Sequence, residues 1–197
     1  VPRFGFGSAG DVALVDGDRS DVVAGLDATR RRIGAVVDAD SGAVFTAGFI
    51  VDGDGAKVGA VWKLDVDAGT EVQVIGGLEK PVGLAIVDGV LYVSDQARGE
   101  IGRATLPDLD DYAVFAAGLE SADLLSAGPK GSLFTGSKTG KVFLIAASGT
   151  AATFAGGFQE VRGTAYDAAH ARLFVADHDG DESDGITHQL RILPVDL

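Results

Sequence analysis

The stretch "PVGLAIVDGVLYVSDQARGEIGRAT", residues 81–105, decides the fold class. It contains three runs rich in apolar and β-branched residues, "PVGLAIV", "VLYVS" and "EIGRAT", and short segments with Asp and Gly separate them. Short apolar runs divided by turn residues are typical of antiparallel strands. The stretch therefore predicts three consecutive antiparallel strands joined by tight turns.

The same arrangement recurs along the chain. A small-Gly-apolar marker returns at intervals of 52, 41 and 39 residues, and its copies end at Leu26, Leu78, Leu119 and Phe158. An apolar strand with a central aromatic residue returns at intervals of 47, 42 and 40 residues, at Phe45, Tyr92, Phe134 and Phe174. Two independent markers with one period near 40 residues indicate a repeat architecture.

Each complete repeat carries four strand-like segments, and no stretch has sustained helical periodicity. This pattern predicts an all-β fold, a β-propeller of four-stranded antiparallel blades in a single domain, residues 1–197, with four to five blades visible. The expected blades are 11–32 (partial), 33–80, 81–121, 122–160 and 161–197 (partial).

The strand count leaves the closure of the propeller open. Two strands at the N-terminus, three full units and three final strands give 17, whereas five complete blades need 20. We expect a ring of four or five blades that closes by pairing the N-terminal strands with the last blade, because closure removes exposed strand edges. A fragment of a six-bladed protein and a gap covered by a partner are the alternatives.

The segments "PVGLA" and "GVLYVSDQARGEIGRA" resemble the blades of the NHL-type and gluconolactonase/strictosidine-synthase-like propeller superfamily, and weaker echoes extend over residues 33–197. That superfamily contains hydrolases, lyases and binding modules, so the resemblance implies an architecture and not an activity. For its lactonase-like members it implies a divalent cation held by Glu, Asn and Asp in the central channel. This chain departs from that pattern, since Pro81 and Val82 stand where such members have Ser-Asn, and it has no Asn.

Charge narrows the classes of partner. The formal net charge is -13, which repels nucleic acid and anionic lipid surfaces, so we expect no nucleic-acid partner and no membrane insertion. No apolar run approaches the roughly 20 residues that a membrane helix needs. The chain has no Cys, so disulfides give no information on its compartment. It has no Met, and numbering from Val1 indicates the loss of either a cleaved targeting segment or a longer piece of protein; of these we expect export to a periplasmic, extracellular or organelle lumen.

Blade geometry predicts where a ligand or partner would bind. The start of the first strand and the end of the second strand of each blade lie on the same face, which we call the loop face. The candidate positions on this face are Arg32, Lys80, Asp95, Arg98, Asp123 and Arg162, and Lys138 is expected on the same face. For Asp95 we expect a structural role, in which its carboxylate accepts backbone N–H groups of the turn "QARG".

An acidic loop, "DHDGDESDG", is the candidate metal site. Its carboxylates at Asp177, Asp179, Asp181 and Asp184 alternate in a loop that contains Gly, which suits the oxygen coordination of Ca²⁺. The EF-hand pattern is not met, because Glu182 and His188 stand at its sixth and twelfth positions. A hydrated acidic turn is the alternative to calcium binding, and no other cofactor is expected.

These observations favour a non-catalytic propeller that binds a protein partner, as a scaffold or an accessory subunit of a larger assembly. The sequence contains no Gly-x-Ser-x-Gly elbow and no Gly-rich phosphate loop. The alternative is a divalent-metal-dependent, lactonase-like hydrolase that acts on a small ester or lactone in the channel. Binding of a small molecule without turnover is a third reading.

Overall fold

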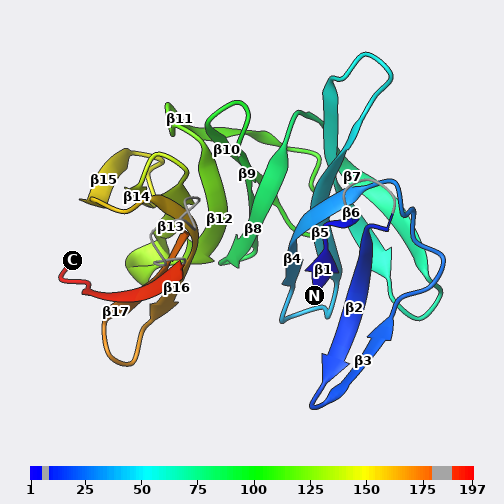
Figure 1. Ribbon diagram of the computed structural model, residues 1–197, viewed down its shortest axis with the longest axis horizontal. Helices are drawn as coiled ribbons and strands as arrows, with labels where there is room; N and C mark the ends of the chain where they lie inside the picture. The colour runs from blue at the N-terminus through cyan, green and yellow to red at the C-terminus, as the bar shows by residue number, and fades with distance from the viewer. Residues whose placement is uncertain (6–8, 179–187) are drawn as a thin grey trace.

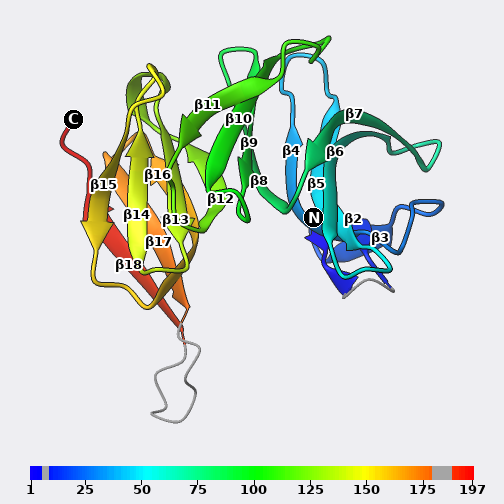
Figure 2. The same cartoon turned by 90° about the horizontal axis from the view of Figure 1, so that it is seen from above.

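The computed structural model describes residues 1–5, 9–178 and 188–197. It is a five-bladed, all-β propeller, which confirms the predicted fold class of antiparallel, mostly four-stranded blades. Figure 1 shows the five sheets following one another around an arc, with the first and last blades on opposite sides of the molecule, and Figure 2 shows the same order from above.

Three blades have four strands. Blade 2 consists of β4 (Arg31–Val37), β5 (Val44–Val51), β6 (Lys57–Asp65) and β7 (Thr70–Leu78). Blade 3 consists of β8 (Pro81–Val87), β9 (Val90–Asp95), β10 (Glu100–Thr105) and β11 (Ala113–Ala117). Blade 4 consists of β12 (Ala122–Ala127), β13 (Leu133–Ser137), β14 (Lys141–Ile145) and β15 (Ala151–Gly156), and a 3₁₀ turn (Pro129–Gly131) lies between its first two strands.

The two terminal blades have three strands each among the described residues. Blade 1 consists of β1 (Pro2–Arg3), β2 (Asp11–Asp16) and β3 (Arg19–Val22), and blade 5 consists of β16 (Glu160–Asp167), β17 (Arg172–His178) and β18 (His188–Pro194). The N-terminal strands pair with one another and not with blade 5, so the expected closure of the ring by strand pairing is wrong. The sequence missed β1, which is two residues long and too short to show a period.

The hydrophobic core lies between neighbouring blades. Every residue of β13 is buried, because this second strand is covered on both faces. The aromatic residues Phe45, Tyr92 and Phe134 of blades 2 to 4 fill the space between sheets, whereas Phe174 of blade 5 is half-buried. Phe45 of blade 2 packs in one cluster with Leu91 of blade 3, and Phe134 packs with Leu173 of blade 5. The second strands are therefore stabilised by burial against the next blade as well as by their backbone hydrogen bonds.

The first strands line the centre of the arc and approach one another closely. Strands β4, β8, β12 and β16 pack side by side in that order, and β1 packs against β4. A Cβ atom on Gly83 would lie 2.6 Å from the backbone nitrogen of Leu125 in the next blade, so a larger residue cannot be accommodated without a backbone shift. Small residues in the first strands thus set the spacing of the blades around the channel. Among the described residues no helix is long and apolar enough to span a membrane.

Candidate functional site

A β-bulge recurs near the start of the first strand in blades 2 to 5. In β8, for example, Pro81 is opposite Asp95 and Gly83 is opposite Ser94, which leaves Val82 without a partner residue. Bulges re-aim side chains and are common beside functional sites. The residues that the four bulges leave out of register include Ile33, Val82, Asp123 and Arg162, and all four line the same cavity.

This cavity, which we call the channel pocket, has a volume of about 490 Å³. Its polar lining residues are Arg32, Lys80, Gln96, Asp123, Lys138 and Arg162. Its apolar lining residues are Pro2, Phe4, Ile33 and Val82. The volume is within the range of pockets that hold small molecules, about 300–1,000 Å³.

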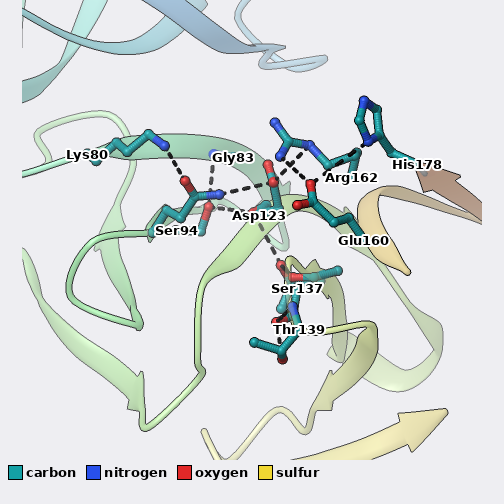
Figure 3. A network of polar contacts seen from close by, with 12 residues as sticks. Lys80, Gly83, Ser94, Asp123, Ser137, Thr139, Glu160, Arg162 and His178 are labelled. Atoms are coloured by element: carbon teal, nitrogen blue, oxygen red, sulfur yellow. Dashed lines mark hydrogen bonds and ion pairs between the residues drawn. The ribbon is translucent and has the colours of Figure 1, made fainter. Parts of the chain in front are cut away.

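A chain of polar contacts joins the charged side of the pocket. The ammonium group of Lys80 donates to Oε1 of Gln96, and Nε2 of Gln96 donates to Oδ2 of Asp123 at 3.0 Å. The same carboxylate oxygen lies 3.4 Å from Nε of Arg162, whose Nη1 in turn lies 3.2 Å from Glu160. Figure 3 shows Lys80, Asp123, Arg162 and Glu160 along this network.

Positive charge dominates the pocket. Among the described residues, the carboxylate of Asp123 is the only acidic lining group, against four cationic side chains. The side chain of Lys138 makes no hydrogen bond or ion pair with any residue in the described part of the chain, and the ammonium group of Lys80 donates there only to the neutral Gln96. Burial, followed by the charges of Lys138 and Lys57, lowers the pKa of Lys80. Among the described residues, therefore, neither ammonium group forms an ion pair with a carboxylate, and Asp123 acts on both only at longer range.

Asp123 is fixed through its backbone as well as its side chain. Its carbonyl oxygen accepts hydrogen bonds from the hydroxyls of Ser94 and Thr135, at 2.7 and 3.2 Å. Burial raises the pKa of Asp123, and the charges of Arg162, Lys138 and Lys80 offset only part of that effect. The residue is 3% exposed and lines the pocket, and its hydrogen bonds hold it in place.

In blade 2 the structure corrects the position predicted from sequence. Ile33, not Arg32, occupies the bulge position that corresponds to Asp123 and Arg162. Arg32 lines the pocket but is 0% exposed, and its guanidinium bonds both carboxylate oxygens of Glu71 at 2.8 and 2.9 Å. Its Nε has no hydrogen-bond partner in the described ranges. A one-residue change of register moves a side chain to the other face of a strand, and the sequence does not show where the bulge lies.

Asp95 and Arg98 lie outside the lining of the channel pocket. The carboxylate of Asp95 accepts the backbone N–H groups of Glu79 and Lys80 at 2.8 and 2.9 Å, so its role is structural, as expected. The expected donors were wrong, because these N–H groups belong to the loop that leads into the blade and not to the turn "QARG". Arg98 is 44% exposed and lies 3.6 Å from Asp95, where it makes a surface ion pair.

The candidate calcium ligands are only partly described. Asp177 has the same role as Asp95, since its carboxylate accepts the N–H of Gln159 at 2.9 Å and lies 3.1 Å from Arg191. Asp179, Asp181 and Asp184 lie outside the described residues. Within the described ranges, no cluster of three or more His, Asp or Glu side chains is placed to bind a metal ion. Calcium binding by the acidic loop stays a prediction.

The divalent cation implied by lactonase-like propellers does not fit the channel pocket. Such an ion needs several oxygen ligands, and carboxylates supply most of its charge neutralisation. Among the described lining residues, Asp123 supplies the one carboxylate, and it already bonds Gln96 and Arg162. The ammonium groups of Lys80 and Lys138 would repel the ion.

Sequence reasoning missed four lining residues, Pro2, Phe4, Ile33 and Gln96, together with Glu71 behind Arg32. Gln96 follows Asp95 directly, at the end of a second strand, so its place on the loop face was open to prediction. Phe4 precedes the first repeat, where the period gives no guidance. Glu71 lies 39 residues from Arg32, and only the tertiary structure brings the two together.

Comparison with solved structures supports the fold. The chain matches a propeller in the nidogen/laminin complex with a TM-score of 0.70 and 16% identity, over 86% of this chain and 67% of the other. It matches a gluconolactonase from Xanthomonas campestris with a TM-score of 0.69 and 21% identity, over 86% of this chain and 62% of the other. It matches regucalcin from Agrobacterium tumefaciens, a calcium-binding protein, with a TM-score of 0.61 and 12% identity, over 98% and 92% of the two chains.

These likenesses confirm the resemblance to gluconolactonase-like propellers at the level of fold. The chain spans less than two thirds of the length of the Xanthomonas enzyme. No protein-family profile matches the sequence, and no curated protein is significantly similar to it.

Proposed function

We propose that this chain is a non-catalytic binding propeller, a scaffold or accessory subunit whose loop face holds a partner. In this proposal the channel pocket receives an anionic group of that partner. The observation that carries the proposal is the excess of cationic side chains over a single carboxylate in the pocket. Complementary charge across an interface gives specificity and accelerates association.

The arrangement of the pocket supports binding more than acid–base catalysis. A hydrolase needs a base or nucleophile free to contact its substrate. Asp123, the one acidic lining group, is instead held by Gln96 and Arg162. The rigid bulges and the inter-blade hydrogen bonds provide a preformed surface, which lowers the entropic cost of association.

The alternative is a lactonase-like hydrolase, and the likeness in fold to the Xanthomonas gluconolactonase favours it. In that case Asp123 and Arg162 would be the reactive groups, because they project from the bulges into the pocket. The poor fit of the pocket to a divalent cation argues for the binding role.

Native mass spectrometry of the protein isolated from its own source without chelators tests the proposal. We expect a stoichiometric complex for the wild type and its loss in Lys138→Glu, which reverses a charge in the pocket. Glu120→Gln is the matched control, since Glu120 is 66% exposed and is not a lining residue.

Two results would overturn the proposal. One is a wild-type chain that carries no additional mass. The other is hydrolysis of lactones or esters by the purified protein that is abolished by Asp123→Ala and Arg162→Ala and retained in Glu120→Gln.

A further inference from the structure

We infer that the channel pocket recognises a carboxylate joined to an apolar body. This inference rests on the proposed binding function and names the chemistry of the bound group. It follows from the lining, in which cationic and apolar side chains lie together. It also follows from a division among the bulge residues, which are apolar in one half of the arc and charged in the other.

The bulges create this division. Blades 2 and 3 contribute Ile33 and Val82, whereas blades 4 and 5 contribute Asp123 and Arg162. The bulges therefore place apolar residues of blades 2 and 3, and charged residues of blades 4 and 5, in the pocket lining. A fully hydrophilic anion would leave the apolar lining residues, Pro2, Phe4, Ile33 and Val82, without a matching surface.

Lysine side chains provide the pocket with ammonium donors that no carboxylate of the described residues bonds. Lys138 has no hydrogen bond or ion pair with the described residues, and Lys80 has no ion pair among them. The orphaned Nε of the fully buried Arg32, which also lines the pocket, is a further donor without a described acceptor. Cationic donors bind carboxylate oxygens through short charge-assisted hydrogen bonds, which are about twice as strong as neutral ones.

The apolar lining residues near the N-terminus, Pro2 and Phe4, are held in place by contacts with neighbouring side chains and strands. The ring of Phe4 packs edge-on against Phe49 at 6.2 Å between centroids, and the guanidinium of Arg31 lies 5.7 Å from the same ring. Pro2 lies in strand β1, which packs against β4, and Phe4 follows directly after this strand. The N-terminal segment therefore supplies a fixed hydrophobic wall beside Ile33.

Two sources present such a group, a free organic acid and the C-terminus of a protein that ends in an apolar residue. The test uses isothermal titration calorimetry with 4-phenylbutyrate as the free acid and acetyl-Gly-Gly-Phe as the peptide. The neutral 4-phenylbutan-1-ol and the C-terminally amidated peptide remove the charge, and acetate removes the apolar body.

We expect one or both of the apolar carboxylates to bind at least about tenfold more tightly than the matched neutral compound and than acetate. Lys138→Gln is expected to weaken that binding by about tenfold, and Phe4→Ala to weaken it without changing the response to acetate. Lys130→Gln is the control, because Lys130 is bonded to the carbonyl of Leu197 and lies outside the pocket. Tighter binding of the peptide identifies a protein terminus as the source, and tighter binding of phenylbutyrate identifies a free acid.

Equal binding of the acid and its neutral partner would overturn the inference, as would acetate binding as tightly as phenylbutyrate. Binding by neither carboxylate, or affinity unchanged in Lys138→Gln, would also overturn it. The proposed function fails separately. A partner complex in native spectra with no carboxylate binding leaves that function standing, whereas ester hydrolysis that depends on Asp123 removes the function even if carboxylates bind.

Discussion

Blades 2 and 3 hold the loops that lead into them with carboxylates from different strands. In each, the loop that leads into the blade must be attached to the blade's own sheet. In blade 3 the carboxylate of Asp95, at the end of the second strand, accepts two backbone N–H groups of that loop. In blade 2 the equivalent position is Gly48, and Glu71 on a different strand accepts the N–H of Asp27 at 3.1 Å.

The difference has a steric cause. A Cβ atom on Gly48 would lie 2.6 Å from the carbonyl oxygen of Arg31, so no side chain fits there without a backbone shift. The buried Arg32 occupies the adjacent space, and it requires a carboxylate partner, which Glu71 provides. The blade with the glycine therefore depends on a buried ion pair, and the blade with the aspartate depends on a local carboxylate bond.

The comparison predicts that blade 2 is the more sensitive to a single substitution. Glu71→Ala leaves the fully buried Arg32 without its counter-ion, and we expect a loss of about 3–5 kcal/mol in the free energy of unfolding, measured with urea. Glu120→Ala, which removes an exposed acid 3.7 Å from Lys141, is the control, with an expected loss below about 0.5 kcal/mol.

The effect of Glu71 should also depend on pH. Burial alone would raise the pKa of Glu71, but hydrogen bonds from Arg32 and Asp27 and the nearby arginine charges hold it below its usual value. A lowered pKa stabilises the fold above the ordinary carboxyl pKa, and this contribution is lost as the pH falls through the folded-state pKa. A difference between wild type and Glu71→Ala that stays constant under acid conditions would contradict the ion-pair account.

Asp95→Ala should have an intermediate effect. It leaves the N–H groups of Glu79 and Lys80 without their acceptor, at an expected loss of about 2 kcal/mol in unfolding free energy. Asp177→Ala is the matched variant in blade 5 and removes one such backbone bond, so a smaller loss is expected. A larger effect for Asp177 than for Asp95 would show that the backbone bonds are not the main contribution.

Ser137→Ala should have the smallest effect of the three. Ser137 occupies the position of Asp95 in blade 4, and its hydroxyl donates to the carbonyl of Glu120 at 2.5 Å. The same hydroxyl lies 2.8 Å from the hydroxyl of Thr139 and accepts the Thr139 N–H at 3.1 Å. All of these are neutral hydrogen bonds, so we expect a loss of about 1.5 kcal/mol in urea unfolding. Ser148→Ala, on an exposed turn, is the control. Equal losses of unfolding free energy in the two variants would show that Ser137 does not hold the entry loop of blade 4 as Asp95 holds that of blade 3.

The candidate site shows the limits of prediction from sequence at single residues. Lys80, Asp123 and Arg162 were predicted on the loop face from blade geometry, and all three line the pocket. Arg32 was also predicted on the loop face and lines the pocket, but the bulge position in its strand belongs to Ile33, and no residue type in the sequence marks a bulge. Arg98 was predicted on the loop face from the same blade geometry, but its side chain is exposed beside Asp95 and lies outside the pocket lining.

The sequence by itself determined the blade, because period-two apolar runs, turn glycines and an aromatic residue every 40 or so positions are local patterns that bury only as stacked antiparallel sheets. It also determined the equivalence of Asp95 and Asp177, which stand at the same place in two repeats. Only the tertiary structure decided which strands end the arc, where the bulges lie and which carboxylate neutralises Arg32. Those features depend on the approach of backbones from different blades, and distances between chain segments remote in sequence leave no mark in a local pattern.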